Sequence, residues 1–474
     1  MTEAEIGLIG LAVMGQNLVL NMLDHGYSVV AYNRSSEKTD ELVKRAKSRK
    51  NLFAAKNLPE LVSKLSKPRK IMLMIKAGDP VDKIIQELLP LLETGDIIID
   101  GGNSNYKDTI RRTKELEKHG LLFIGTGISG GEEGARNGPS IMPGGSSNAW
   151  ISIKNIFKDI AAKLEDGFSC CEWIGSDGAG HYVKMVHNGI EYGDMELIVE
   201  AYSLLRFGLN KSCDEISDIF DQWNKGKLNS YLIEITSSIL KVKDQDGKPL
   251  VDKILDSAGQ KGTGKWTAIS GLEEGIAIPL IAEAVFQRFL SSFKKIRGSA
   301  ASKYENILNK NKVPANFTVD DVEGALYLSK IVSYAQGFHL ITSASERYSW
   351  NINLADLALL WRGGCIIRSI FLEKINQAYK TNNKLENLLL DPFFIREISQ
   401  GVQQWRKVVS EAFLQHIPGG IPGFASSLAY FDGLCSETIP ANLIQAQRDY
   451  FGAHGYKRID KPKSEDFHTE WGNF

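Results

Sequence analysis

The residues of this 474-residue chain whose types and spacing suit catalysis lie between positions 184 and 192, in the segment KMVHNGIEY. At about 100° per residue, an α-helix would place four polar side chains of this segment on one face. They are Lys184, His187, Asn188 and Glu191. An amine, a carboxylic acid and two hydrogen-bonding groups on one face can accept a proton, donate one and hold a polyol. A solvated polar helix face is the alternative.

The neighbours of these residues favour the catalytic interpretation. Met185, Val186, Ile190 and Met195 are apolar, so we expect the helix to be buried. A dinucleotide-binding pattern also lies upstream of this helix in the chain.

That pattern begins with a short apolar strand, Ile6–Ile9, and continues with a glycine turn and an amphipathic helix through about Asp24. Gly10 permits the tight turn, Ala12 is small enough for a pyrophosphate to approach, and Gly15 lets helix pack on strand. The free N–H groups at the helix N-terminus would bind the pyrophosphate. The predicted cofactor contacts are Gly10, Leu11, Ala12, Val13, Met14 and Gly15.

The end of the second predicted strand, Tyr27–Tyr32, indicates which dinucleotide binds. An NAD enzyme usually has an acidic residue here for the ribose 2′-hydroxyl, whereas this chain has Asn33, Arg34 and Ser35. The Arg34 guanidinium can bind a 2′-phosphate through two hydrogen bonds. We therefore predict NADP as the cofactor, with an ordinary solvent-exposed arginine as the alternative.

Alternating strands and helices continue and predict a doubly wound α/β domain of the Rossmann type over residues 1–177. The further strands expected are Ile71–Ile75, Ile97–Asp100 and Leu121–Gly125, with helices near Val81–Leu92 and Tyr106–His119. Ligands bind such sheets at the carboxyl ends of the strands. The candidates in these loops are Ile75, Lys76 and Ala77 for the cofactor, Asn103 for cofactor or substrate, and Ser129, Gly130 and Gly131 as a nest for an anion. Ordinary turn chemistry is the alternative for Asn103 and for the glycine turn.

Long segments with helical periodicity then predict an all-helical domain over residues 178–434. The last segment, residues 435–474, is too short to fold alone, so we expect it to dock, with a partner subunit as one place to do so. A disordered end is the alternative, against which Tyr450, Phe451 and Trp471 argue.

A faint repeat within the helical domain places Lys330 where the first copy has Lys184, at an offset of 146 residues (330 − 184). Ser333 then stands in the place of His187. If the domain is duplicated, only the first copy keeps the chemistry.

Cationic side chains in the helical domain are candidates for binding an anion. Lys261 lies in a glycine-rich loop, 257–266, that lacks the Walker A pattern. Arg288 lies among apolar residues of the predicted helix Ile281–Phe293, so its guanidinium should have an anionic partner. An internal ion pair with Glu283 is the alternative.

Composition argues against several classes of protein. The formal net charge of −1 disfavours nucleic acid or an anionic membrane as a partner. No apolar run approaches the ~20 residues that span a bilayer, and the acidic N-terminus carries no secretory or transit signal. The five cysteines lack metal-ligand spacing, so we expect reduced core thiols in a cytoplasmic protein.

Taken together, these motifs resemble those of the decarboxylating 6-phosphogluconate dehydrogenases over nearly the whole chain. The segments that carry the resemblance are, in order, GLAVMG, Asn33-Arg34-Ser35, IDGGNS, GISGGEEGAR, KMVHNGIEYGDM, DSAGQKGTGKW, WRGGCIIRS and ANLIQAQRDYFGAH. Ser35 replaces the threonine common in the family, and the other functional positions match.

The resemblance implies oxidation of 6-phospho-D-gluconate by NADP+ to D-ribulose 5-phosphate and CO2 without a metal, a step of the pentose phosphate pathway. It implies Lys184 as general base and acid, and a protonated Glu191 as proton donor to the enediol. The substrate contacts implied are Asn103, His187 and Asn188 for the sugar, Ser129, Gly130 and Gly131 for the carboxylate, and Tyr192, Lys261, Arg288, Arg448 and His454 around the phosphate. Because the tail arginine and histidine of the family serve the neighbouring subunit, a homodimer is also implied.

Two other functions share part of this pattern. A general 3-hydroxyacid dehydrogenase or imine-reducing relative would have the glycine turn and Lys184, but would not need Lys261, Arg288 and Arg448. A non-enzymatic NADPH-binding protein would be expected to lose Lys184 or Glu191, and both are present.

Overall fold

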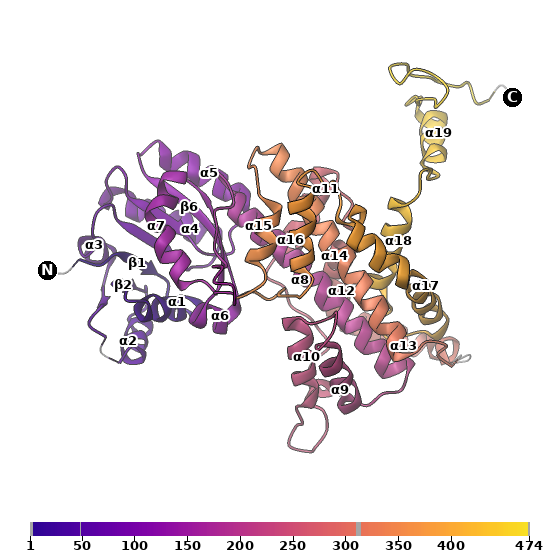
Figure 1. Ribbon diagram of the computed structural model, residues 1–474, viewed down its shortest axis with the longest axis horizontal. Helices are drawn as coiled ribbons and strands as arrows, with labels where there is room; N and C mark the ends of the chain where they lie inside the picture. Colours follow the sequence, from indigo (N-terminus) through magenta and orange to yellow (C-terminus); the bar gives the residue numbers. More distant parts are fainter. Residues whose placement is uncertain (1–2, 48, 310–313, 473–474) are drawn as a thin grey trace. The chain divides into compact units, whose positions relative to one another are not determined.

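The computed structural model describes residues 3–47, 49–309 and 314–472 (Figure 1). The chain forms two compact units, one that ends at Ser427 and one that begins at Leu428. The first unit contains the sheet and most of the helices, and the second contains the tail.

One sheet of seven strands lies within the described residues, in the order β3-β2-β1-β4-β5-β6-β7. Strands β1 to β6 run parallel, and β7 pairs with β6 in the antiparallel direction. The parallel part has the strand order of a Rossmann fold. The strands are β1 (Ile6–Ile9), β2 (Val29–Tyr32), β3 (Leu52–Ala54), β4 (Lys70–Leu73), β5 (Ile97–Asp100), β6 (Leu122–Ser129) and β7 (Ser140–Gly145).

Helices cover both faces of the sheet. Because successive residues of a strand point to opposite faces, neighbouring residues belong to different hydrophobic cores. Leu8 and Ile99 belong to one core, and Ile9 and Ile98 belong to the other. This arrangement confirms the predicted doubly wound α/β domain. The first core includes α1 (Val13–Asp24), α2 (Ser36–Arg45), α6 (Gly131–Asn137) and α7 (Ser147–Ile160); the second includes α3 (Leu58–Ser63), α4 (Asp79–Leu88), which runs into the 3-10 turn η1 (Leu89–Leu91), and α5 (Tyr106–Glu117).

Two strands, β3 and β7, lie outside the predicted set, and both are edge strands. β3 has only three residues, and β7 contains Pro143, which a sheet accepts at an edge because an edge strand can leave an N–H position unpaired. Pairing with β7 also extends β6 beyond the predicted end at Gly125 to Ser129. The predicted glycine turn therefore begins at the last residue of a strand.

After β7 the described part of the chain contains helices and no further strand, which confirms the predicted all-helical domain. α8 and α14, the two longest of these helices, pack against each other. The helices are α8 (Ala179–Ser203), the π-helical turn η2 (Leu204–Gly208), α9 (Cys213–Trp223), α10 (Tyr231–Lys241), η3 (Leu250–Lys253), α11 (Thr263–Glu274), α12 (Pro279–Ser292), α13 (Lys294–Asn309), α14 (Val319–Arg347), α15 (Leu354–Leu360), α16 (Leu372–Thr381), η4 (Leu388–Leu390), α17 (Pro392–Gln415) and α18 (Pro422–Leu434).

The order α8, α9, α10 recurs as α14, α15, α16, as a duplicated domain would require. Ser230, just before α10, and Ser369, just before α16, are joined by an isolated antiparallel bridge. The duplication stays a prediction that these observations support.

Glycines allow the N-terminal half of α8 to approach the sheet backbone closely. A Cβ added at Gly180 would lie 2.4 Å from the Met142 carbonyl oxygen and 2.5 Å from that of Gly125. A Cβ added at Gly127, on β6, would lie 2.3 Å from the Cβ of Lys184. The Lys184 side chain therefore begins directly against the sheet.

The tail forms its own small structure around α19 (Ala441–Gly452) and a short pairing of Tyr456 with Phe467. The buried Asp449 carboxylate accepts hydrogen bonds from four N–H groups, those of Gly455, His468, Thr469 and the Trp471 indole, at 2.8 to 3.0 Å. These bonds give the described tail residues a defined conformation, as its aromatic residues predict.

Four cysteines are buried, as predicted, whereas Cys435 is exposed, so the expectation that all five belong to the core is wrong for this one. The tail segment that follows α18 does not cover it. Among the described residues, no helix combines the length and apolar character needed to cross a membrane.

We expect Gly180→Ala to lower the free energy of unfolding by about 1–3 kcal/mol or more, because the added Cβ overlaps two backbone oxygens that cannot rotate away. Gly324→Ala in α14, where an added Cβ meets no atom within 4 Å, is the control and should be neutral or stabilising by up to about 1 kcal/mol. Thermal or urea unfolding measures both, and equal effects would contradict the proposed close packing.

Candidate active site

The four polar residues of the 184–192 segment lie on α8, which runs along the interface between the sheet and the rest of the helical domain. Lys184 and His187 are buried, Asn188 is half-buried, and the Glu191 side chain is 20% exposed. Of the apolar neighbours expected to be buried, Met185, Val186 and Ile190 are, but Met195 is 38% exposed. The part of α8 that carries Lys184, His187 and Glu191 is therefore largely buried, and the helix becomes exposed at Met195.

Lys184 is placed to act as a neutral amine. Burial lowers its pKa, and the negative charge of Glu191 opposes this effect more weakly. No hydrogen bond or ion pair joins its amine to another side chain within the residues described. A buried amine with no partnering carboxylate is favoured in the uncharged form, which can accept a proton.

His187 connects α8 to the predicted carboxylate-binding turn. Its Nδ1 lies 3.1 Å from the Asn188 Oδ1, which accepts, so Nε2 is left to accept from the Ser129 hydroxyl at 3.3 Å. Burial holds the pKa of His187 well below its usual value, so the ring is neutral. The Asn188 amide also donates to Thr263 Oγ1 at 3.0 Å, which brings the start of α11 to the same place.

Glu191 has the opposite pKa shift to Lys184. Burial raises its pKa, while the charges of Lys184 and Arg288 oppose the rise. Its carboxylate lies 4.0 Å from His187 Nδ1. Burial therefore shifts the acid and the amine on one helix face toward their neutral forms, which is the direction needed for one proton donor and one proton acceptor.

The turn Ser129-Gly130-Gly131 joins β6 to α6 and packs against a loop that is distant in sequence. Gly130 has a φ of +122°, and a Cβ added there would lie 2.6 Å from the Gly364 carbonyl oxygen. That same carbonyl accepts a hydrogen bond from Ser140 N at 2.8 Å. Backbone therefore meets backbone here, and only glycine fits at position 130.

The loop 361–368 contains residues of the site that the sequence reasoning did not single out. The buried Trp361 ring lies 5.5 Å from the His187 ring in an edge-on arrangement. Burial raises the pKa of the Cys365 thiol to about 12, and the thiol donates to the Trp361 carbonyl at 3.1 Å. The adjacent glycines of WRGGC were the available clue, because paired glycines often mark a close backbone approach.

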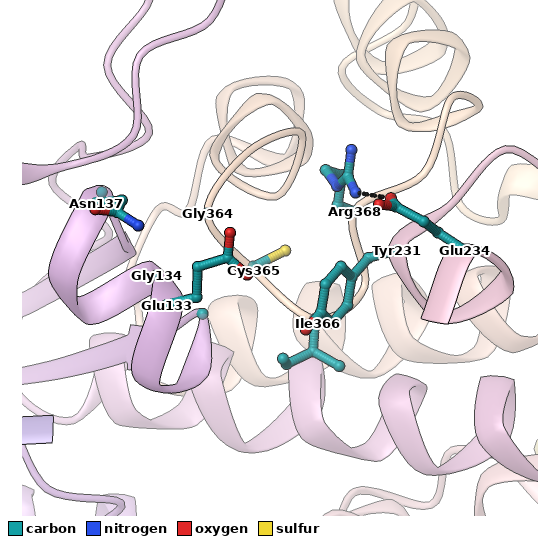
Figure 2. Close-up of a pocket in the computed structure, with 11 residues that line it drawn as sticks. Glu133, Gly134, Asn137, Tyr231, Glu234, Gly364, Cys365, Ile366 and Arg368 are labelled. Carbon is teal, nitrogen blue, oxygen red and sulfur yellow. Dashed lines mark hydrogen bonds and ion pairs between the residues drawn. The ribbon is translucent and has the colours of Figure 1, made fainter. Parts of the chain in front are cut away.

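A cavity of about 360 Å³ opens beside this turn, between α6 and α10 (Figure 2). Gly130, Gly364 and Cys365 form part of its wall, so it borders the site around Lys184. Arg368 and Glu234 form an ion pair of 2.6 Å at its α10 side. The other lining residues are Glu133, Gly134, Asn137, Gly138, Tyr231 and Ile366.

The glycine turn after β1 fits a dinucleotide. Gly10 has a φ of +101°, and a Cβ added at Gly15 would lie 1.9 Å from the Gly10 carbonyl oxygen, so both positions require glycine. Among the described residues, no side chain caps the N-terminus of α1, where Ala12 and Val13 are exposed and Met14 is half-buried. The backbone N–H groups of this helix end are thus open to a pyrophosphate.

The end of β2 fits the predicted 2′-phosphate. Asn33 Oδ1 accepts from Leu11 N at 2.9 Å and so fixes this strand end to the glycine turn. Arg34 is exposed and pairs with no carboxylate in the part of the chain that is described. A backbone hydrogen bond and, after it, a hydrogen bond with the Ser35 side chain lower the pKa of Glu37, so this acid is already engaged.

Arg288 lies against Tyr192, which follows Glu191 directly and Asn188 by one helical turn. The guanidinium lies 3.7 Å above the Tyr192 ring, and its Nη1 donates to the Gly259 carbonyl at 2.8 Å. The alternative of an ion pair with Glu283 is not seen among the described residues. Lys261 is exposed in the same loop as Gly259, and neither Lys261 nor Arg288 pairs with a carboxylate in the described part of the chain.

The remaining candidates divide between the two units. Asn103 is exposed after β5, and Ile75, Lys76 and Ala77 follow β4, all at the carboxyl edge of the sheet. Arg448 and His454 are exposed in the tail unit, where Arg448 donates to Gln445 at 3.0 Å. No group of three His, Cys, Asp or Glu side chains suited to a metal ion occurs within the described ranges.

Comparison with known proteins identifies the family. Residues 5–175 match the model of the NAD binding domain of 6-phosphogluconate dehydrogenase, and residues 180–471 match that of the 6-phosphogluconate dehydrogenase C-terminal domain. This chain belongs to the 6-phosphogluconate dehydrogenase family.

The match extends along the whole chain. The decarboxylating 6-phosphogluconate dehydrogenases of Cunninghamella elegans and Homo sapiens are 56% and 54% identical to it, over 99% of this chain and 96% and 97% of theirs. The Plasmodium falciparum enzyme, whose structures include complexes with its cofactor NADP+ and its substrate 6-phosphogluconate, is 46% identical. It aligns with a TM-score of 0.93 over 98% of this chain and 100% of its own.

We expect Arg34→Ala to weaken NADP+ binding by about 10- to 100-fold, because a charge-assisted contact to the 2′-phosphate is lost. Binding of NAD+, which lacks that phosphate, should change far less. Fluorescence titration with both dinucleotides checks this, with Lys38→Ala, an exposed cation of α2 paired with Glu41, as the control. Equal weakening for both dinucleotides would show that Arg34 does not recognise the phosphate.

Proposed function

We propose that this chain catalyses the oxidative decarboxylation of 6-phospho-D-gluconate to D-ribulose 5-phosphate and CO2 with reduction of NADP+. In this proposal residues 1–177 hold the cofactor, residues 178–434 hold the substrate, and residues 435–474 serve a neighbouring subunit. The observation that carries it is the buried face of α8, where Lys184 has a lowered pKa and Glu191 a raised one. Membership of the 6-phosphogluconate dehydrogenase family supports the same reaction.

The first proton transfer falls to Lys184. Its neutral amine accepts the proton of the C3 hydroxyl as the hydride leaves C3, which yields a 3-keto acid. When bound, NADP+ supplies the acceptor for that hydride. The resulting ammonium then donates a hydrogen bond to the new C3 oxygen and stabilises negative charge there as the C1–C2 bond breaks.

The second proton transfer falls to Glu191. As CO2 leaves, the Lys184 ammonium returns its proton to the C3 oxygen, which gives an enediol across C2 and C3 of the original sugar acid and a neutral amine. The neutral Glu191 carboxyl then donates a proton to the former C2. The Lys184 amine accepts the proton of the enediol hydroxyl on the former C3, and the ketone of the product forms there. After its proton transfer, Lys184 is an ammonium and Glu191 is a carboxylate. Burial disfavours both charged forms, so each group tends to return to its neutral form.

Substrate placement follows from the groups around this pair. The N–H groups of Gly130 and Gly131 and the Ser129 hydroxyl suit the carboxylate, and Asn103, His187 and Asn188 suit the sugar hydroxyls. Tyr192, Lys261 and Arg288 suit the phosphate, because Arg288 has no anionic partner of its own among the described residues.

A homodimer with exchanged tails completes the proposal. Apolar side chains are exposed in both units: Leu272, Phe286 and Ile307 are 60–85% exposed in the first, and Tyr450 and Phe451 are 68% and 73% exposed in the tail. Exposed apolar side chains on both units suit the contact between two copies that this proposal requires. Arg448 and His454 would then add to the phosphate site of the neighbouring subunit. A cytoplasmic location stays a prediction.

Absorbance at 340 nm tests the reaction, because reduced nicotinamide absorbs there. The enzyme should reduce NADP+ with 6-phosphogluconate but not with unphosphorylated gluconate, which would fit a general hydroxyacid dehydrogenase. We expect Lys184→Ala to lower kcat by about 10²- to 10⁴-fold while the Kd for NADP+ stays within about twofold. Lys154→Ala, an exposed lysine of α7, is the control, and a near-normal kcat for Lys184→Ala would remove it as the base.

Mixed dimers test the exchanged tail. Lys184→Ala and Arg448→Ala should each be nearly inactive as homodimers, whereas their coexpression should restore about a quarter of normal activity, since half the dimers then hold one intact site. Coexpression of Lys184→Ala with the Lys184→Ala/Arg448→Ala double variant creates no intact site and is the control. Failure of restoration, or full activity of Arg448→Ala alone, would reject the exchanged tail.

A further inference from the structure

A fully buried ion pair lies on α8 three residues beyond Glu191, on the side that packs against α14. Lys330 Nζ is 2.6 Å from Asp194 Oδ2, and the two side chains are 0% and 1% exposed. The helices approach closely at this point, since a Cβ added at Gly193 would lie 2.7 Å from Ser333 Oγ. Burial of two charges is costly, so the pair is unlike an ordinary surface salt bridge.

Tyr334 extends this pair to a third segment of the chain. It follows Lys330 by four residues, so both side chains leave the same face of α14. Its hydroxyl lies 2.8 Å from the Ile367 carbonyl oxygen and 3.4 Å from Asp194 Oδ2. A hydroxyl has one proton to donate, so the shorter contact makes the Ile367 carbonyl the main acceptor and the Asp194 carboxylate a weaker second one.

Ile367 belongs to the loop 361–368, which contacts the site on two sides. Trp361 packs edge-on against His187, and Gly364 presses its carbonyl against Gly130 of the predicted carboxylate turn. The Cys365 side of the loop lines the cavity beside that turn (Figure 2). The position of this loop therefore sets where the turn and the histidine lie.

Hydrogen bonds hold the loop at its middle, through the Gly364 carbonyl, and near its C-terminal end, through the Ile367 carbonyl. Tyr334 fixes Ile367 to α14, and Ser140 N, at the start of β7, donates to Gly364 at 2.8 Å. Tyr334 is itself held by the Lys330–Asp194 pair below it and by the Phe371 ring, 4.6 Å away, beside it. Removal of the hydroxyl would remove the bond that joins Ile367 to α14, while the ring packing and the neighbouring contacts of Arg368 with Tyr231 N and Glu234 stay.

We propose that Tyr334, held in place by the buried Lys330–Asp194 pair, is a positioning residue that fixes the loop 361–368 against the substrate-carboxylate turn. The inference rests on the proposed function, since it assigns the turn to the carboxylate of 6-phosphogluconate. The residue touches neither substrate nor cofactor, so its effect falls on substrate binding and leaves the dinucleotide site unchanged.

Tyr334→Phe tests the proposal, because it removes only the hydroxyl. We expect the KM for 6-phosphogluconate to rise about five- to tenfold, with kcat within about threefold and the Kd for NADP+ within about twofold of the parent. Tyr379→Phe is the matched control: Tyr379 is a buried tyrosine of α16 that stacks on Phe338, and its hydroxyl has no hydrogen-bond partner among the described residues. It should change none of these constants.

Three outcomes would overturn the inference: an unchanged KM in Tyr334→Phe, a fall in kcat with no change in KM, or an equal loss of affinity for NADP+. Should Tyr334→Phe not fold, the Asp194→Asn/Lys330→Met variant removes the supporting charges at nearly constant volume, and a KM within twofold of the parent there would also overturn it. A parent enzyme inactive toward 6-phosphogluconate refutes the proposed function instead, so the two failures are distinguishable.

Discussion

The site depends on one constraint: an amine must lie where water does not reach it. Lys184 meets this requirement because α8 lies against the sheet at the distance that Gly127 and Gly180 allow. The hydrophobic cores on both faces of the sheet hold β6 in place, and β6 in turn places Ser129 at the start of the glycine turn. The same close packing that buries Lys184 therefore also positions the groups suited to a carboxylate.

Two lysines at equivalent positions of the predicted repeat show how one partner changes the chemistry. Lys330 is as deeply buried as Lys184, but Asp194 lies 2.6 Å from its amine and forms an ion pair. Lys184 has Glu191 nearby in place of a bonded carboxylate, and burial lowers its pKa. If the repeat arose by duplication, the second lysine now supports the packing of α8 on α14, while the first is the base of the proposed reaction.

Particular residues show where sequence reasoning succeeded and where it did not. The helical spacing of Lys184, His187 and Glu191 and the strand–turn–helix around Gly10 were readable, because both depend on local geometry. β7 was missed because Pro143 and its glycines weaken the strand pattern, and only pairing with β6 makes it a strand. Met195 and Cys435 were expected to be buried from their apolar character alone, yet burial depends on what other segments cover them.

The sequence alone determined the order of the two domain types, the dinucleotide turn with its arginine, and the polar face of α8, since short-range periodicity and spacing decide these features. Tertiary structure decided which of those polar side chains are buried away from water and which form hydrogen bonds or ion pairs. Asp194 and Lys330 are 136 positions apart, and His187 and Trp361 are 174 apart (361 − 187), so no local pattern records either contact. The direction of each pKa shift follows from such contacts, because desolvation arises from every element packed around a group.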